Sequence, residues 1–282
     1  MSTYYYLVAG LPDLTLEDSK LSYTVADFKT ELYPHLSPAD KRLVDLFYLK
    51  YDNANVLKLL KDKDAHIDVC GNYAADTLAE YIAALKDGDH LPDSIFPSYL
   101  STFITEHFSQ SAEGTNLLPE DRLASLYYAY AMRCKNRFVS RWFEFNLTVN
   151  NVLVALTGRK YKIDVSSLIV GDTEVCEALR TSNARDFGLG TEVDYLDAVM
   201  KLAEVDDLVE REKKLDQLRW AWMEEATLFD YFTIERLFVF LLQVEMIERW
   251  LSLDKEKGNQ LFRQMIATLK DEVQIPEEFS MR

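Results

Sequence analysis

A gap-free internal repeat constrains the fold of this chain more than any other feature of its sequence. Residues 46–68 align with residues 142–164 at an offset of 96 positions, with seven identities in 23. Each copy has apolar residues at helical spacing, then a polar or basic corner, then an Ile-Asp pair. Copies spaced at roughly a third of the chain predict a stack of similar helical modules.

A weaker third copy is expected from about residue 237, and its register has two alternatives. One follows the apolar positions of the first copy. A shift of two residues instead places Glu245 and Glu248 over Asp52 and Asn55. The repeat therefore predicts three related modules, and we place them at residues 1–108, 117–186 and 191–282.

The expected fold class is mainly all-α. Nine Gly and seven Pro in 282 residues are few for a loop-rich or all-β protein. Ser37 followed by Pro38 predicts a helix start, and one long helix is expected from Leu118 to about residue 156. The aromatic residues 4–11 predict at most a short N-terminal strand or extended lead-in.

Asn55 and Asn151 occupy equivalent positions in the two stronger copies. Polar residues at the seam between helices can fix the register of packing. We therefore expect both amides to be at least partly buried. Each should be bonded to backbone or to a side chain of the paired helix.

Arg133, Arg137 and Arg141 follow one another at intervals of four and are expected to share one face of a helix. They have two interpretations. They pair with acidic neighbours in a chain that carries 47 Asp and Glu, or they form a basic strip that receives an acidic partner or a phosphate.

The net charge of −16 argues against a general nucleic-acid binder and against adsorption to anionic lipid. No stretch of 18 uninterrupted apolar residues is present, so no direct membrane insertion is expected. Three cysteines far apart are typical of a reducing compartment. The first residues have no basic region before an apolar run, so we expect no signal peptide.

No catalytic or metal-binding motif is recognisable, and we expect neither enzyme activity nor a cofactor or metal. The four His occur in unrelated contexts, without HxxxH or HExxH, and the cysteines lack zinc-ligand spacing. One alternative remains from the acidic residues 204–212, which could bind Mg²⁺ in a hydrolase.

Several segments resemble one known family. Asp52-x-x-Asn55-Val56-Leu57, the stretch 232–248 with its Ile-Glu pair and later acidic residues, and the aromatic residues 4–6 carry the resemblance. They are similar to the C subunit of archaeal and bacterial V-type ATP synthases, whose eukaryotic counterpart is the d subunit. This chain resembles a divergent group encoded with such ATPase genes. It departs from the pattern at Thr148, which stands where the motif has Asp, and at Glu248, which stands for its Asn.

The resemblance implies three helical bundles arranged as a funnel. A protein of this kind sits on the cytoplasmic side of the membrane rotor ring and receives the central shaft in its socket. It has no active site and binds no nucleotide. Its partners are the central-shaft subunits and the rotor ring, and it is peripheral to the membrane. The rival interpretation is a free-standing helical scaffold that binds regulatory proteins.

Overall fold

The computed structural model describes residues 3–109 and 118–253, and these residues contain eleven α-helices and no strand. The expected all-α fold is therefore confirmed. Residues 110–117, between the first two expected modules, and residues 254–282 of the third lie outside the described parts.

The N-terminal part consists of short helical pieces. They are α1 (Tyr5–Ala9), α2 (Val25–Asp27), the π-helical turn η1 (Phe28–Leu32) and the 3-10 turn η2 (Tyr33–His35). The strand considered for residues 4–11 does not form. A strand needs a neighbour with which to pair, and none exists among the described residues.

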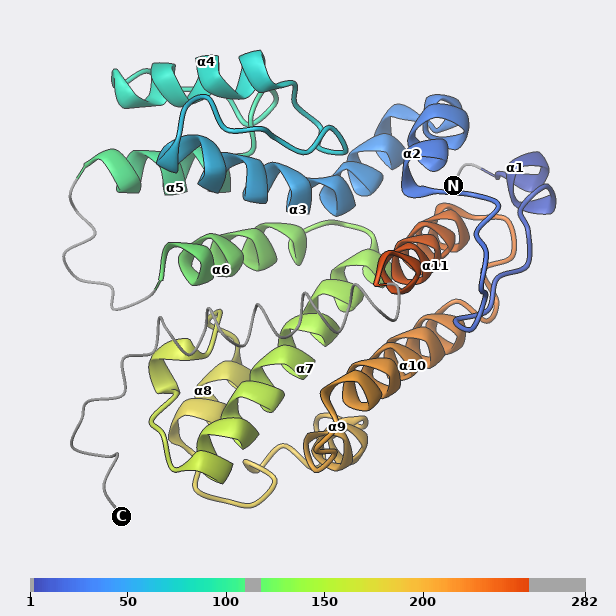
Figure 1. The fold of residues 1–282 in the computed structure, drawn as a ribbon, viewed down its shortest axis with the longest axis vertical. Coiled ribbons are helices and arrows are strands. Elements are labelled where there is room, and N and C mark those ends of the chain that lie inside the picture. The colour runs from blue at the N-terminus through green and yellow to red at the C-terminus, as the bar shows by residue number, and fades with distance from the viewer. Residues whose placement is uncertain (1–2, 110–117, 254–282) are drawn as a thin grey trace.

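Three helices follow, α3 (Pro38–Lys61), α4 (Ala75–Lys86) and α5 (Ser98–Phe108), and they stack in the upper half of Figure 1. Helix α3 begins where the sequence predicts, with Pro38 as its first residue. The Ser37 hydroxyl accepts a hydrogen bond from the backbone N–H of Asp40 at 3.2 Å.

The next group is α6 (Pro119–Ala131), α7 (Arg137–Tyr161), the 3-10 turn η3 (Ser166–Leu168) and α8 (Glu174–Thr181). The single helix expected over residues 118–156 is wrong, because the chain turns at residues 132–136. There the Asn136 side chain accepts from the N–H of Val139 at 3.0 Å and caps a new helix. The Ser140 hydroxyl donates to the carbonyl of Met132 at 2.6 Å across the turn.

The last group is α9 (Leu196–Ala203), α10 (Leu208–Ala226) and α11 (Ile234–Ser252). Figure 1 shows α7 running diagonally between α6 at one end and α8 at the other, with α10 and α11 to the right. The middle of α11 is buried at every position from 237 to 244, so this helix lies in the interior. One continuous core includes residues from α2 to α11. No helix in the described part of the chain is long and apolar enough to cross a bilayer.

The two stronger repeat copies lie in α3 and α7, and their burial patterns match at most positions within the helices, although Tyr48 is buried and the aligned Glu144 is exposed. Phe47 and Phe143 are buried, as are Val56 and Val152. The copies diverge after the helices end. Ile67 is buried whereas Ile163 is 61% exposed, so the matching Ile-Asp pairs are not structurally equivalent.

Candidate functional site

Asn55 connects α3 to the loop that follows it. Its Oδ1 accepts from the backbone N–H of Asp68 at 2.8 Å, and its Nδ2 donates to the carbonyl of the same residue at 2.9 Å. The side chain is fully buried. Both backbone groups of one loop residue are thus satisfied by one amide, away from water.

Asp52 lies one helical turn before Asn55, is also fully buried and holds the next part of the loop. Its carboxylate accepts from the N–H of Asn72 at 2.9 Å and of Tyr73 at 3.2 Å. Burial raises the pKa of Asp52 to about 6, and these N–H donors and nearby Lys29 oppose the rise. Gly71 packs so closely that a Cβ there would lie 2.4 Å from Asp52 Oδ1.

Lys29 completes this cluster from the π-helical turn η1. Its ammonium donates to the carbonyls of Cys70, at 2.7 Å, and Gly71. Burial lowers the pKa of Lys29, and the charge of Asp52 opposes that shift. Sequence reasoning missed Lys29, because the repeat has no counterpart of η1 and a π-turn has no sequence signature that would reveal it.

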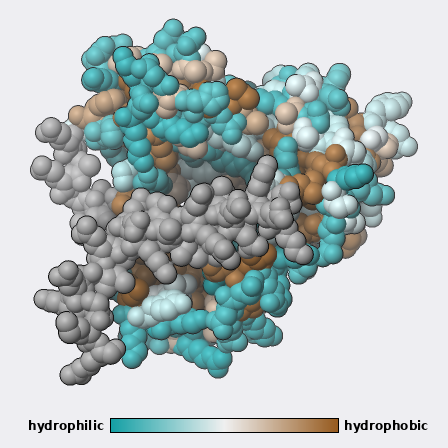
Figure 2. All heavy atoms as spheres, viewed as in Figure 1, coloured by the Kyte–Doolittle hydropathy of each residue, from teal (hydrophilic) through white to brown (hydrophobic). Residues whose placement is uncertain are grey.

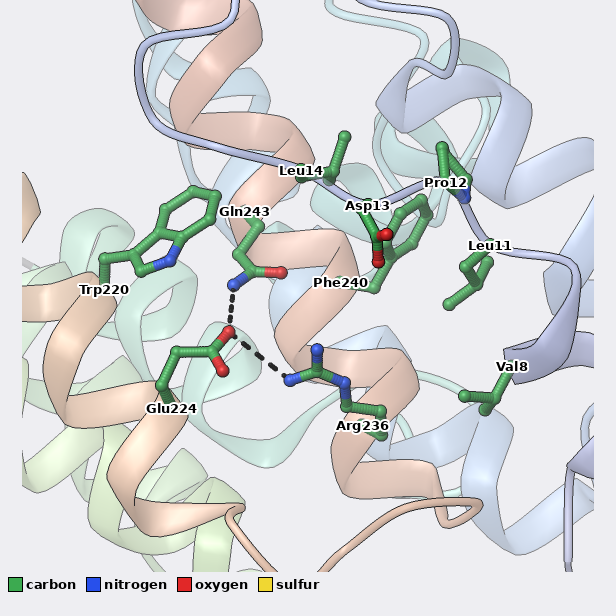
Figure 3. A pocket seen from close by; sticks show the side chains of 10 residues that line it. All are labelled: Val8, Leu11, Pro12, Asp13, Leu14, Trp220, Glu224, Arg236, Phe240 and Gln243. Carbon is green, nitrogen blue, oxygen red and sulfur yellow. Dashed lines mark hydrogen bonds and ion pairs between the residues drawn. The ribbon is translucent and has the colours of Figure 1, made fainter.

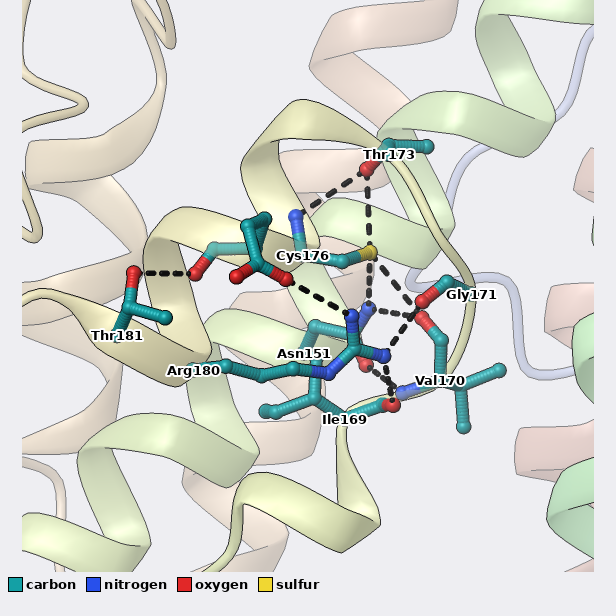
Figure 4. A network of polar contacts seen from close by, with 9 residues as sticks. Asn151, Ile169, Val170, Gly171, Thr173, Cys176, Arg180 and Thr181 are labelled. Atoms are coloured by element: carbon teal, nitrogen blue, oxygen red, sulfur yellow. Dashed lines mark hydrogen bonds and ion pairs between the residues drawn. The ribbon is translucent and has the colours of Figure 1, made fainter. Parts of the chain in front are cut away.

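Asn151 makes the equivalent contact in the second copy (Figure 4). Its Oδ1 accepts from the N–H of Val170 at 3.0 Å, and its Nδ2 donates to the Val170 carbonyl at 2.7 Å. The held residue lies 19 positions after Asn151, whereas Asp68 lies 13 after Asn55. This difference of six residues has two sources. Helix α7 continues four residues further beyond Asn151 than α3 does beyond Asn55, and the segment between the helix end and the bonded loop residue is two residues longer.

The side chains around Asn151 differ from those around Asn55. Thr148, in the place of Asp52, is buried. The Cys176 thiol accepts from Asn151 Nδ2 at 3.3 Å and donates to the Val170 carbonyl at 3.2 Å. Arg180 donates to the carbonyls of Ile169 at 2.8 Å and Gly171 at 2.6 Å, as Lys29 does to loop carbonyls in the first copy. The two copies share the arrangement of these contacts but differ in the side chains that make them.

The residues that the predicted third copy aligns with Asp52 and Asn55 lie on α11 and make different contacts. Glu248 accepts from the backbone N–H of Val25 at 3.3 Å, so its partner comes from α2 and not from a following loop. Glu245 forms an ion pair with Lys50 of α3 at 2.9 Å, in which both side chains are about one third exposed. Burial lowers the pKa of Lys50, and Glu245 opposes the shift.

The arginine strip is only partly formed. Arg133 lies in the turn between α6 and α7, so the expectation that three arginines share one helix face is wrong. Arg137 and Arg141 are both exposed on the first turns of α7. The Arg141 guanidinium lies over the ring of Trp222 at 6.0 Å from its centroid.

The acidic residues before and within α10 do not converge on a metal site. Asp206 pairs with Lys160 at 3.0 Å, and Glu210 pairs with Lys214 at 2.7 Å. Asp207 caps α10 by accepting from the N–H of Glu210. Across residues 3–109 and 118–253, no group of three His, Cys, Asp or Glu is placed to hold a metal ion.

A pocket of about 390 Å³ opens between the extended residues 11–14 and helices α10 and α11 (Figure 3). Glu224 lies at one side, where its Oε1 accepts from Gln243 at 2.7 Å and from Arg236 at 3.4 Å. Trp220 and Phe240 contribute aromatic surface to the lining. Sequence reasoning did not find this pocket, because its walls are far apart along the chain.

Fold and contacts together define an all-α protein in which α3 and α7 each hold the loop that follows them through a buried amide. The chain belongs to the family DUF2764, described as a protein of unknown function, whose model matches residues 1–273. No curated protein and no solved structure matches it significantly.

Proposed function

We propose that this protein is a non-catalytic socket subunit of a V-type ATP synthase, which couples the rotary shaft to the membrane rotor ring. One observation supports this most directly. The two Asn-Val-Leu segments that carry the resemblance lie at matching places in α3 and α7, and each Asn holds a loop residue by both backbone groups. Repeated modules of one design are what a socket with several similar walls requires.

The contacts also suit a mechanical role. A wall that transmits torque must not let its loops move relative to its helices. Buried hydrogen bonds are strong where water is excluded, and here they join the loops to α3 and α7. Lys29 and Arg180 add charged donors to carbonyls of the same loops. This role uses no nucleotide, metal or cofactor.

In this proposal the protein lies on the cytoplasmic side of the membrane, held there by its partners. These partners are the central-shaft subunits and the rotor ring. Arg137 and Arg141, with Arg133 on the adjoining turn, are the proposed docking site for acidic residues of a partner. Charges at an interface mainly increase the rate of association.

Affinity purification of the full chain from its native cell tests the proposal. We expect rotary ATPase subunits to be recovered with it, and the pure protein to show no ATPase activity. Recovery without any such subunit, under conditions in which the ATPase stays assembled, contradicts the proposal. That result would favour the free-standing scaffold.

Charge reversal tests the docking site separately. The double variant Arg137→Glu and Arg141→Glu should bind the purified shaft subunits roughly tenfold more slowly at low salt, with a smaller effect at high salt. Lys58→Glu with Lys63→Glu is the matched control, since both lysines are exposed near the end of α3. Equal association rates for both double variants would remove the arginines from the proposal and leave the socket role intact.

A further inference from the structure

Five large apolar side chains are exposed together where α1 meets the turn between α10 and α11. We call this surface the aromatic tip; it consists of Tyr5, Tyr6, Leu228, Phe229 and Tyr231. Tyr6 is 90% exposed and Phe229 is 82% exposed. The two segments are in contact, because the N–H of Tyr4 donates to the carbonyl of Phe232 at 2.7 Å and the rings of Tyr5 and Phe232 lie 4.7 Å apart.

The pocket described above adjoins the aromatic tip. Val8 of α1 lines it on one side, and Glu224, four residues before Leu228, lines it on another. Figure 2 shows apolar surface at the right of the molecule, next to the pale surface of α1. Residues of α1 and α10 close in sequence to the tip thus line a recess, and an apolar surface beside a recess is the usual form of an anchoring site for a protein partner.

The charges around this surface have one predominant sign. Residues 221–235 contain four carboxylates, of Glu224, Glu225, Asp230 and Glu235, and no Lys or Arg. Asp13 adds a fifth at the pocket, where Arg236 is the one cation among the lining residues and is bound to Glu224. Burial and the repulsion of Glu235 raise the pKa of Asp230, so a cation placed there would relieve this repulsion.

We propose that the aromatic tip and the adjoining pocket bind a basic amphipathic helix of another protein. Its aliphatic side chains would cover the tip, and one Lys or Arg would enter the pocket at Asp13, since Glu224 is already paired with Arg236. Trp220 and Phe240 offer ring faces to such a cation. This inference does not depend on the rotary function.

Charge argues against two other occupants. A second copy would bring the same carboxylates against these, in a chain whose net charge is −16. An anionic lipid surface would be repelled for the same reason. A basic amphipathic helix supplies aliphatic cover for the aromatic tip and positive charge for the carboxylates.

Photo-crosslinking in the native cell tests the inference. A benzophenone amino acid replaces Phe229 in the full chain, and Tyr161 is replaced as the matched control because it is a 63% exposed aromatic residue far along the sequence, at the end of α7. We expect an adduct from position 229 at well above the yield from position 161. Sequencing of the crosslinked peptide should show aliphatic residues and Lys or Arg at helical spacing.

Neutralising carboxylates then tests the charge argument. Asp13→Asn with Asp230→Asn should lower the adduct yield roughly three- to tenfold. The melting temperature should not fall, because neither side chain has a hydrogen bond to lose within residues 3–109 and 118–253 and Asp230→Asn removes the repulsion from Glu235. Asp64→Asn with Asp89→Asn, at exposed positions elsewhere, should leave the yield unchanged. Crosslinking of position 229 to lipid, to another copy of this chain or to an acidic segment would overturn the proposal, as would a yield no higher than at position 161.

Discussion

Asn55 and Asn151 lie 96 positions apart, and each holds the backbone N–H and carbonyl of a single loop residue with its own amide. Both side chains are buried. A buried two-point contact of this kind fixes both the position and the direction of the loop. Any side chain that cannot both donate and accept leaves at least one of these backbone groups unsatisfied in the interior.

Asn55→Leu and Asn151→Leu should each lower the free energy of unfolding by about 1–3 kcal/mol, because the partners at Asp68 and Val170 lose their hydrogen bonds. Urea denaturation measures the change. Asn183→Leu is the control, since Asn183 is exposed. Equal stability of the three variants would show that the amides do not hold the loops.

Gly71→Ala should destabilise the first module by about 1–3 kcal/mol, because the added methyl would overlap the Asp52 carboxylate and the loop would have to move. Urea denaturation again gives the measurement. Gly10→Ala is the control: Gly10 has a φ of −90°, and its nearest neighbour lies 3.5 Å from the new Cβ. The cost of Gly71→Ala should shrink in an Asp52→Ala background if this overlap is its cause.

Asp52 should give the protein a specific dependence on pH. Its pKa is raised from 3.8 to about 6 by burial, so between these values the folded protein binds a proton more readily than the unfolded chain. The stability contributed by Asp52 is therefore greatest at low pH and is lost as pH rises through about 6.

Asp52→Asn removes this titration. The stability of the variant relative to wild type should increase by roughly 2–3 kcal/mol between pH 4 and pH 7.5, since one pKa unit corresponds to about 1.4 kcal/mol. Urea denaturation at both pH values measures it. A stability difference that stays constant across this range would contradict the raised pKa.

Lys50 and Glu245 should be energetically coupled across α3 and α11. A double-mutant cycle with Lys50→Met and Glu245→Gln should give a coupling of about 1 kcal/mol, because the pair is partly shielded from water. The pair of Lys160 and Asp206 is the control. Its distance is similar at 3.0 Å, but Asp206 is 90% exposed, so its coupling should be close to zero.

The sequence alone predicted the class of fold and the residues that occupy equivalent positions in the two stronger repeat copies. Apolar spacing identified the helices around Phe47 and Phe143, because helix burial repeats with the helical period. The same alignment placed Asn55 and Asn151 in equivalent buried positions. Local chemistry also located one helix start, at Ser37 and Pro38.

Other features depend on contacts that local sequence does not encode. The turn before Asn136 interrupts a good helical pattern, because capping by this side chain competes with continuing the helix. The Ile-Asp pairs of the two copies match in sequence but not in structure. The reason is that α7 continues past the position that the repeat aligns with the end of α3. Lys29 joins the first module from a segment with no counterpart in the repeat.

The hydrogen bond between Val25 and Glu248 spans 223 positions, and the bond between Tyr4 and Phe232 spans slightly more. These long-range bonds have a consequence for synthesis on the ribosome. The first residues to emerge cannot make these contacts until α11 has been made, so α1 and α2 must wait while the central helices fold. Closing so long a loop costs conformational entropy before any contact is gained, which makes this step late and slow. A nascent chain that stalls before residue 234 would expose the apolar side chains that α11 normally covers and become a substrate for chaperones.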